Sequence, residues 1–332
     1  MKISNYTNSL KSMALARLGK KTPIKVIHYI TSSCNLHCGF CLAEELKREH
    51  DLTTIEIKRC MNEFKAAGTQ VWDFEGGEPL LRRDIDEIIE HACKLGFVVT
   101  ITTNGILVDK HIKALRKADF INISVDGPRE IHNKIRGANC FDTIIKNIDE
   151  LVNNGIRPTI NMVVCKENLR EMDYMVKLAI EHKCKIDFSL VVANLEHIEP
   201  YTLTKEEVEK AVRKILELKA KHPKTVNCSP SYLRRIVKYY NREIKRFIPK
   251  CLAGTAFCSI SPSGEVALCV ERLKESINGR KIGYNKAFQK LKNPGCDCTW
   301  RCFYNLSQMY SLKPLTLVRV GYNTLRGRWV HS

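Results

Sequence analysis

Three cysteines lie close together in the sequence. Cys34, Cys38 and Cys41 occupy a CxxxCxxC spacing directly after an apolar, β-branched run. Thiolates on such a loop can each bind one iron of a [4Fe–4S] cluster. No fourth cysteine stands nearby, so one iron is left open for a substrate or cofactor, and an open metal position is typical of catalysis. The alternative is a closed zinc site completed by His37.

A second group of cysteines lies in the last third of the chain. Cysteines gathered in this way within an intracellular protein indicate a metal site rather than disulfides. One four-cysteine iron–sulfur cluster is the economical interpretation, with two incompletely ligated clusters or a zinc site as the alternatives. The group consists of Cys251, Cys258, Cys269, Cys296, Cys298 and Cys302. Scattered cysteines, interpreted as small buried side chains, are Cys60, Cys93, Cys140, Cys165, Cys184 and Cys228.

The segments that must position these residues alternate between two patterns. From Ile24 to Asn194, short apolar, β-branched runs alternate with longer amphipathic segments. Near-continuous apolar strands separated by helices predict a parallel sheet covered on its outer face. Six such units predict an α/β fold with an incomplete barrel, whose functional residues follow the carboxyl ends of the strands. The expected strands are residues 26–30, 71–74, 98–102, 121–125, 158–164 and 186–191, and the expected helices are residues 55–67, 85–95, 111–117, 141–154 and 169–182.

Polar and glycine residues follow the second, third and fourth expected strands. After the second strand, glycines let a backbone approach a ligand closely, and Glu78 offers charge to a cation. Hydroxyl, amide and carboxylate groups after the next two strands can bind a polar ligand. For Thr102, Asn104 and Arg136 the alternative is turn chemistry and a solvated cation. The candidate ligand-binding residues are Gly76, Gly77, Glu78, Pro79, Thr102, Asn104, Ser124, Asp126 and Arg136.

The cysteine loop and these motifs resemble, in order, those of the radical SAM superfamily. An aromatic residue, Phe40, stands directly before the third cysteine, and residues 76–79 match the family's GGEP motif. The resemblance covers residues 24–194 and implies a partial (β/α)6 barrel. In this family the open iron of a [4Fe–4S] cluster chelates S-adenosylmethionine (SAM). Reductive cleavage of SAM then gives a 5'-deoxyadenosyl radical, which abstracts hydrogen from an unactivated C–H bond.

The same resemblance implies roles for the candidate residues. The three clustered cysteines would hold the SAM-binding cluster, and Phe40 would pack near the adenine. Glu78 would contact the SAM ammonium, the end of the fourth strand would meet the ribose, and Arg136 would lie near the SAM carboxylate. A flavodoxin or ferredoxin would supply the electron.

The cysteine-rich tail resembles the auxiliary iron–sulfur domains called SPASM and its shorter version, twitch. Cys251, Gly264 and Cys269 reproduce the opening spacing of these domains, and residues 258–261 and 265–269 are expected to form a hairpin around a Pro-Ser-Gly turn. A complete SPASM domain needs about eight cysteines for two clusters, whereas this tail has six. The resemblance therefore implies one auxiliary [4Fe–4S] cluster, with two as the alternative, that accepts or conducts an electron.

Positive charge is concentrated at the two ends of the chain. The net charge is +18, of which residues 1–43 carry +6 and residues 276–332 carry +9. Basic ends interleaved with apolar and aromatic residues fit an anionic membrane surface, and no apolar run is long enough to span a membrane. We therefore expect a cytoplasmic protein, peripheral on the inner face of the membrane.

The expected division of the chain has five parts. A helical connector with two charged, solvent-facing helices, residues 205–221 and 231–247, joins the barrel to the cysteine-rich tail. The parts are residues 1–23, a basic amphipathic segment; 24–195, the barrel; 196–250, the connector; 251–312, the auxiliary cluster domain; and 313–332, a basic apolar tail.

The substrate class follows only from indirect features. The basic ends favour a lipid or lipid-linked substrate, which is the leading hypothesis, with a ribosomally made peptide second. A small molecule or RNA is a weaker alternative; RNA would account for the basic ends, but no aromatic stacking platform or recognised RNA-binding motif is visible. An iron–sulfur electron carrier is the non-enzyme alternative, and it would need no SAM pocket.

Overall fold

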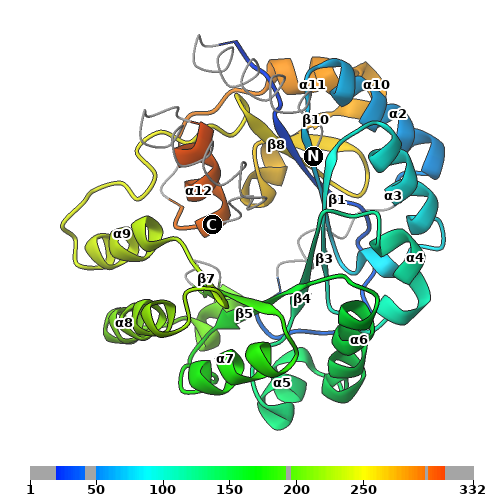
Figure 1. The fold of residues 1–332 in the computed structure, drawn as a ribbon. Coiled ribbons are helices and arrows are strands. Elements are labelled where there is room, and N and C mark those ends of the chain that lie inside the picture. Colours follow the sequence, from blue (N-terminus) through cyan, green and yellow to red (C-terminus); the bar gives the residue numbers. More distant parts are fainter. Residues whose placement is uncertain (1–19, 42–49, 192–195, 296–297, 311–332) are drawn as a thin grey trace.

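A single ten-stranded sheet organises the chain (Figure 1). The computed structural model describes residues 20–41, 50–191, 196–295 and 298–310. The strand order is β10-β9-β8-β1-β2-β3-β4-β5-β6-β7, parallel from β8 to β7 and antiparallel at β9 and β10. The strands are β1 Lys25–Tyr29, β2 Val71–Glu75, β3 Val98–Thr103, β4 Phe120–Ser124, β5 Thr159–Val164, β6 Lys185–Leu190, β7 Val226–Asn227, β8 Phe257–Ile260, β9 Glu265–Ala267 and β10 Ile277–Asn278.

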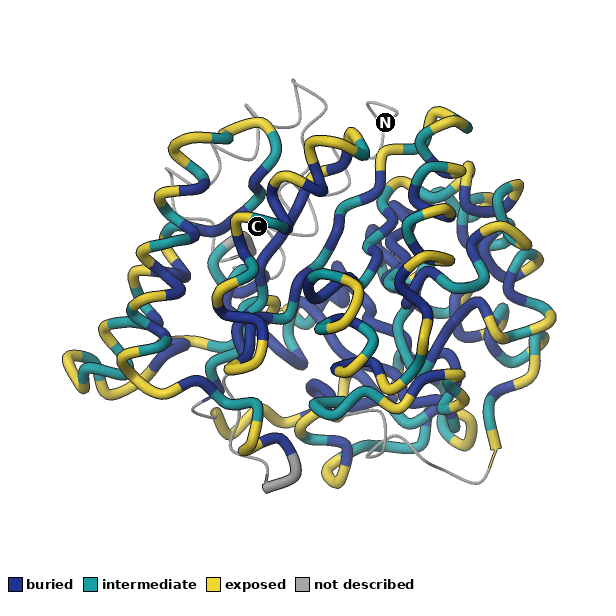
Figure 2. The backbone as a smooth tube through the Cα atoms, turned by 90° about the horizontal axis from the view of Figure 1, so that it is seen from below, coloured by how far each residue is buried: buried dark blue, intermediate teal, exposed yellow. Residues whose placement is uncertain are grey.

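The predicted α/β fold with a parallel sheet is confirmed. The six expected strands correspond to β1–β6, and β-branched and aromatic residues dominate them because such residues pack well on a pleated surface. β1 is buried at all five positions, as expected for a strand with helices on one side and the barrel interior on the other. Figure 2 shows buried backbone concentrated in the centre, with exposed positions on the outer turns of the helices.

Helices follow most strands and cover the outer face of the sheet (Figure 1). Thr53 and Glu56 form a capping box that starts α2, which explains its well-defined first turn. The helices are α2 Thr54–Ala66, α3 Ile85–Lys94, α4 Ile112–Leu115, α5 Arg129–Arg136, α6 Phe141–Asn153, α7 Met172–Glu181, α8 Lys205–Lys221, α9 Pro230–Tyr240, α10 Gly279–Ile282, α11 Tyr284–Lys290 and α12 Arg301–Tyr310, with short 3-10 turns at Pro79–Leu81, Val108–His111, Glu196–Tyr201 and Val270–Glu275.

The connector helices differ from their prediction. They were expected to face solvent, but α8 buries an apolar stripe that includes Val208, Val212 and Ile215, at the spacing of one helix face. α9 ends at Tyr240 rather than continuing to Phe247, and Phe247 is itself fully buried. Charged residues on the remaining faces had masked this stripe.

The cysteine-rich tail returns to the barrel sheet. The expected hairpin is confirmed as β8 and β9, but β8 also pairs in parallel with β1, with Lys25 in register with Phe257 and His28 with Ile260. The sheet therefore has the tail on one side of β1 and the first barrel unit on the other. Nothing local in residues 257–260 indicates this partner.

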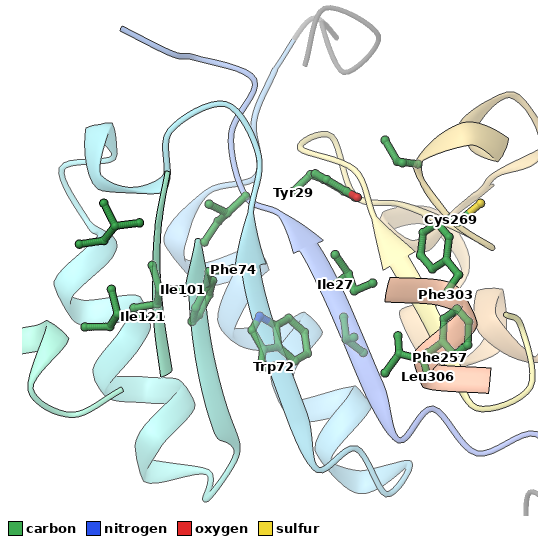
Figure 3. Packing of buried hydrophobic residues seen from close by; sticks show 14 of the residues in the cluster. Ile27, Tyr29, Trp72, Phe74, Ile101, Ile121, Phe257, Cys269, Phe303 and Leu306 are labelled. Atoms are coloured by element: carbon green, nitrogen blue, oxygen red, sulfur yellow. The ribbon is translucent and has the colours of Figure 1, made fainter. Parts of the chain in front are cut away.

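α12 lies on the concave side, between the two ends of the curved sheet (Figure 1). Phe303 stacks on Phe257 of β8, with ring centroids 5.8 Å apart and planes within 3°. Towards the opposite end of the sheet from β8, Arg301 donates hydrogen bonds to Asp187 and, at 3.1 Å, to Ser189, both on β6. Figure 3 shows Phe257, Phe303 and Leu306 packed together beside Ile27 of β1. This helix thus joins strands that the sheet itself keeps apart.

The predicted membrane contact concerns segments that the structure largely leaves undescribed. Residues 1–19 of the N-terminal segment, and the whole of residues 313–332, lie outside the described residues. Among the described residues, no helix combines the length and apolar character needed to cross a bilayer.

Candidate functional site

The cysteine loop after β1 is held by the glycine motif after β2. Gly77 N–H donates to Thr31 C=O and Glu78 N–H donates to Ser33 C=O, each at a distance of 2.8 Å. A Cβ on Gly77 would stand 2.2 Å from the Ser33 carbonyl oxygen, and one on Gly76 would stand 2.6 Å from that of Thr31. The two glycines are therefore required here so that two backbones can meet, whatever further contact they make with a ligand.

A pair of charged residues braces the start of the loop. Asp51 accepts from the Thr31 hydroxyl at 2.5 Å and from Ser32 N–H at 3.3 Å. Arg82 donates to Ile30 C=O at 3.1 Å. Neither Asp51 nor Arg82 was among the sequence candidates, because no short motif marks a residue that supports a loop distant from it in the sequence.

The three loop cysteines are half-buried and lie within electrostatic reach of one another. Burial raises the pKa of Cys34, and the charges of Glu78, Cys38 and Cys41 raise it further. Cys41 N–H donates to Cys38 C=O at 3.1 Å, which closes a tight turn between the last two cysteines. Within the described residues, no three His, Cys, Asp or Glu side chains gather closely enough to enclose a single metal ion.

Glu78 is committed to the protein framework. Its carboxylate is 1% exposed and accepts three hydrogen bonds: from Leu80 N–H at 3.0 Å, from the Thr103 hydroxyl at 2.7 Å and from Asn104 N–H at 2.7 Å. Burial raises its pKa, and these hydrogen bonds oppose that rise. They connect the end of β2 to the end of β3. The contact with a SAM ammonium stays a prediction.

Arg136 links α5 to the cysteine loop. Its Nε donates to Asp126 Oδ2 at 2.6 Å and its Nη1 to Cys38 Sγ at 3.6 Å. The guanidinium also lies 5.7 Å from the centre of the Phe40 ring. Its third nitrogen, Nη2, is buried without a hydrogen-bond partner in the described part of the chain. A buried guanidinium nitrogen of this kind requires an acceptor, which a bound anion would supply.

Asp126 is fixed from several sides by residues that the sequence did not single out. Its Oδ1 accepts from Val163 N–H at 2.9 Å, and Asn168 donates to its backbone carbonyl at 2.9 Å. Asp126 N–H donates to His132 Nδ1 at 3.1 Å. Burial, followed by the charge of Arg136, lowers the pKa of His132 to about 4. The imidazole is therefore neutral at pH 7, with its proton on Nε2 facing Cys140 Sγ.

The remaining predicted ligand residues lie in the cysteine loop itself or at the carboxyl ends of β2, β3 and β4. Asn104 donates to Asn35, in the loop, at 2.7 Å. Thr102 accepts from Asn122 at 3.4 Å, on the concave face of the sheet. Phe40 packs edge-to-face on Tyr201, 5.8 Å between centroids. Pro79 starts a 3-10 turn and is buried, and Ser124 ends β4 half-buried.

Tyr201 is a further residue that the sequence did not single out. A Cβ on Gly39 would stand 1.8 Å from its hydroxyl oxygen, so Tyr201 closes tightly over the loop. With Phe40 it joins a small apolar cluster that is distinct from the main core; the buried members are Ile135, Cys165, Val191 and Ile198.

The concave face of the sheet is polar. Lys25 and Asp73 form an ion pair at 2.6 Å, and Tyr29 forms a hydrogen bond with Glu75. Burial, followed by the charge of Asp73, raises the pKa of Glu75 to about 7. Asp73 Oδ1, Thr100 Oγ1 and Ser259 Oγ are buried without partners among the described residues. Buried polar groups normally form hydrogen bonds with water or a ligand, so this face is suited to binding a polar ligand.

The tail cysteines divide between the two faces of the sheet. Cys302 influences the titration of Lys25 and Tyr29, and Cys269 that of Tyr29, so these two thiols lie near the concave side, whereas Cys298 influences the titration of Tyr232 on α9. Figure 3 draws Tyr29 and Cys269 in the same region. Cys251 is half-buried, and its carbonyl accepts from Asn293 at 3.1 Å.

One predicted tail ligand stands apart from this group, and another lies outside the described residues. Cys258 is fully buried in register with Val26, on the opposite face from its neighbour Phe257, and it affects the titration of Cys60 on α2. The structure therefore does not bring Cys258 together with Cys269 and Cys302. Cys296 lies outside the described residues.

Known proteins resemble this chain in both sequence and fold. Residues 28–179 match the radical SAM superfamily. A protein of Methanosarcina acetivorans named as a probable GTP 3',8-cyclase is 35% identical over 283 residues, which are 79% of this chain and 82% of that protein. The chain belongs to the radical SAM superfamily. It is therefore an enzyme of a family that uses a [4Fe–4S] cluster and SAM.

Other radical SAM proteins resemble the chain over most of its length. An AdoMet-dependent heme synthase of Oleidesulfovibrio alaskensis is 29% identical over 263 residues, 72% of this chain and 68% of that protein. The structure of Streptococcus suis SuiB bound to the precursor peptide SuiA matches with a TM-score of 0.68 and 18% identity, over 91% of this chain and 77% of SuiB. At this identity the SuiB match shows a shared fold.

Proposed function

We propose that this enzyme cleaves SAM at a [4Fe–4S] cluster held by Cys34, Cys38 and Cys41 and abstracts hydrogen from a polar substrate, a peptide, held against the concave face of the sheet. The observation that carries the proposal is the arrangement around Cys38, where a buried, partly unpaired guanidinium stands beside a candidate ligand sulfur. The donor set fits the group, because three thiols suit three irons and Arg136 Nη2 suits a carboxylate.

Some residues of the chain would hold the cysteine loop in place, and others would orient SAM. The backbone contacts of Gly77 and Glu78 keep the cysteine loop against β2. Arg136 would receive the SAM carboxylate, and Phe40, held by Tyr201, would offer an apolar surface to the adenine. When bound and reduced, the cluster supplies the electron that cleaves SAM. Ser124, Thr102 and Asn104, at the carboxyl ends of β4 and β3, are proposed to bind the ribose and the methionine moiety.

An auxiliary cluster is proposed on the tail. Cys269 and Cys302 lie near the concave side, Cys298 lies near Tyr232 on α9, and Cys251 precedes the same hairpin. Because Cys258 lies on the opposite face of the sheet, the proposed ligand set is Cys251, Cys269, Cys302 and one further cysteine, either Cys298 or Cys296, of which Cys296 lies outside the described residues. A cluster there would stand beside the proposed substrate space, in a position to accept an electron from it.

The polar concave face favours a peptide over a lipid. The interior offers the Glu75 carboxylate, the Lys25–Asp73 and Arg301–Asp187 pairs, and unpartnered hydroxyls, which suit amide and side-chain hydrogen bonding. The lipid hypothesis depends largely on the apolar and basic residues of segments 1–19 and 313–332, which lie outside the described residues, so the polar concave face favours a peptide. A bound peptide in the structurally similar SuiB supports the peptide proposal by analogy of fold alone.

A nucleotide substrate is the second candidate. It is favoured by the 35% identity to the probable GTP 3',8-cyclase. A triphosphate needs cations to bind, and the two interior cations named above, Lys25 and Arg301, are each paired with an aspartate. The peptide therefore remains the first choice.

The experiment that tests the proposal follows hydrogen atoms. Reconstituted enzyme is incubated without oxygen with SAM, dithionite and separate peptide, nucleotide, porphyrin and lipid fractions from cells grown in deuterated medium. We expect 5'-deoxyadenosine that carries deuterium only with the peptide fraction, and none from a variant with Cys34, Cys38 and Cys41 replaced by Ala. Label from the nucleotide fraction alone would overturn the peptide assignment, and absence of 5'-deoxyadenosine under every condition would overturn the SAM chemistry.

A further inference from the structure

Arg136 and Asp126 form a buried charged pair with its positive end at Cys38. Arg136 uses Nη1 toward the Cys38 sulfur and Nε toward Asp126, so the guanidinium stands between the sulfur and the carboxylate. We propose that this pair sets the reduction potential of the cluster that Cys38 helps to hold, with Arg136 raising the potential and Asp126 lowering it. The inference rests on the proposed function, which places a cluster on Cys38.

Burial makes both charges effective at this distance. The side chain of Asp126 is fully buried and that of Arg136 is 9% exposed, so water and salt screen them little. The carboxylate is further fixed by Val163 N–H, and its backbone is held by Asn168 and His132. Because the neighbouring imidazole is neutral, it adds no charge of its own. The pair is thus a rigid, oriented dipole.

The sign of each effect follows from the charge that reduction adds. Reduction of a [4Fe–4S] cluster adds one negative charge, which a nearby cation and a hydrogen bond to a ligand sulfur both stabilise. Arg136 provides both and therefore raises the potential. Asp126 opposes reduction, but the guanidinium separates it from the sulfur, so its effect is smaller. Removal of the Arg136 charge should therefore lower the reduction potential, and removal of the Asp126 charge should raise it.

This role is distinct from binding the SAM carboxylate, although Arg136 can serve both. A guanidinium has five N–H donors, and here Nη1 faces the sulfur while Nη2 is left without a partner in the described structure. An effect on the cluster is present without SAM, whereas an effect on the carboxylate appears only in SAM affinity. The two contributions can therefore be measured separately on the same variants.

The test is a redox titration of reconstituted full-length enzyme without SAM, followed by EPR. For Arg136→Gln we expect a midpoint about 59 mV lower, a tenfold change in a one-electron equilibrium, and for Asp126→Asn a smaller rise. The double variant should have a midpoint between those of the Arg136→Gln variant and the wild-type enzyme. Matched controls are Arg129→Gln and Asp142→Asn, because Arg129 and Asp142 form an Arg–Asp pair of the same length on the surface, with side chains 63% and 64% exposed.

The outcomes separate the inference from its alternatives. Unchanged midpoints, or shifts in the same direction for both single variants, would overturn it, since general damage has no reason to produce opposite signs. A fall in SAM affinity with no change in the SAM-free midpoint would assign Arg136 to the carboxylate alone. If Arg136→Gln fails to retain iron, Arg136→Lys and Asp126→Asn decide, and absence of a rise in Asp126→Asn overturns the inference. A wild-type enzyme with no reducible cluster would instead refute the proposed function.

Discussion

Replacing Gly77 with alanine tests whether the glycine motif exists to hold the cysteine loop. The added Cβ would lie 2.2 Å from the Ser33 carbonyl oxygen and 2.6 Å from its carbonyl carbon, whereas ordinary contacts begin at 3.4 Å. Both atoms belong to backbone, so the clash cannot be relieved by rotation of a side chain. The loop that carries Cys34 must therefore move away from β2 by about 1 Å or more.

The energetic cost can be worked from the contacts that this movement breaks. The hydrogen bonds from Gly77 N–H to Thr31 and from Glu78 N–H to Ser33 are both 2.8 Å long. At about 1 kcal/mol each, their loss lowers the free energy of unfolding by about 2 kcal/mol. The larger effect should be on the cluster, since a displaced loop no longer presents three thiols in one arrangement. We expect Gly77→Ala to lose about four irons per chain and to form no 5'-deoxyadenosine.

The assay combines iron determination, EPR and urea denaturation, with Gly155→Ala as the control. Gly155 has a φ of +76° and nothing within 4 Å of its would-be Cβ. Alanine there should cost a comparable 1–2 kcal/mol, about the penalty for a left-handed backbone, without any loss of iron. Gly77→Ala protein with full iron content and normal SAM cleavage would refute the reasoning, and equal iron loss in both variants would reduce it to a general effect of stability.

Three further predictions concern stability and its dependence on pH. Glu78→Gln should lower stability by about 1.5–3 kcal/mol, because an amide cannot accept all three present hydrogen bonds, and should also weaken SAM binding; reduced stability with unchanged SAM affinity in calorimetry would make Glu78 a framework residue only. Arg301→Gln should cost about 3 kcal/mol in urea denaturation by leaving the Asp187 carboxylate buried and unpaired, and a double variant with Asp187→Asn should recover most of it; no recovery would contradict the pairing. Burial, followed by the charge of Arg82, lowers the pKa of His28 to about 3, so the unfolded chain binds a proton at His28 from about pH 6.5 downward while the folded chain does not. The free energy of unfolding should therefore fall as the pH drops below about 6.5, and His28→Met should lessen that fall. Parallel profiles of stability against pH for the two proteins would exclude His28 as the cause.

The barrel could be predicted from the sequence because each of its units carries its own signal. The runs that became β1–β6 are rich in β-branched residues, and the segments between them repeat apolar residues at helical spacing. The three-cysteine motif and the Gly76-Gly77 motif are likewise each contained within a short stretch of sequence. These are local patterns, so a single sequence suffices to see them.

The remaining features depend on contacts between distant parts of the chain. His132 and Asn168 fix Asp126 through backbone atoms, a role that no residue type announces. The pairing of β8 with β1 joins segments more than 200 residues apart. Cys258 is a second example of the difference between sequence spacing and position in space. Its spacing suggested a metal ligand, but the alternation of side chains along β8 places it on the face opposite Phe257, toward α2.

The position of β1 between β2 and β8 has a consequence for how the enzyme is made. β1 and the cysteine loop leave the ribosome early, but the strand that completes the other edge of β1 is synthesised about 230 residues later. At about 5–20 residues per second, that is a delay of roughly 10–50 s. During this interval β1 keeps an open edge, and the loop it carries has support on one side only. Assembly of the proposed cluster on this loop would therefore be favoured after the tail has docked against β1.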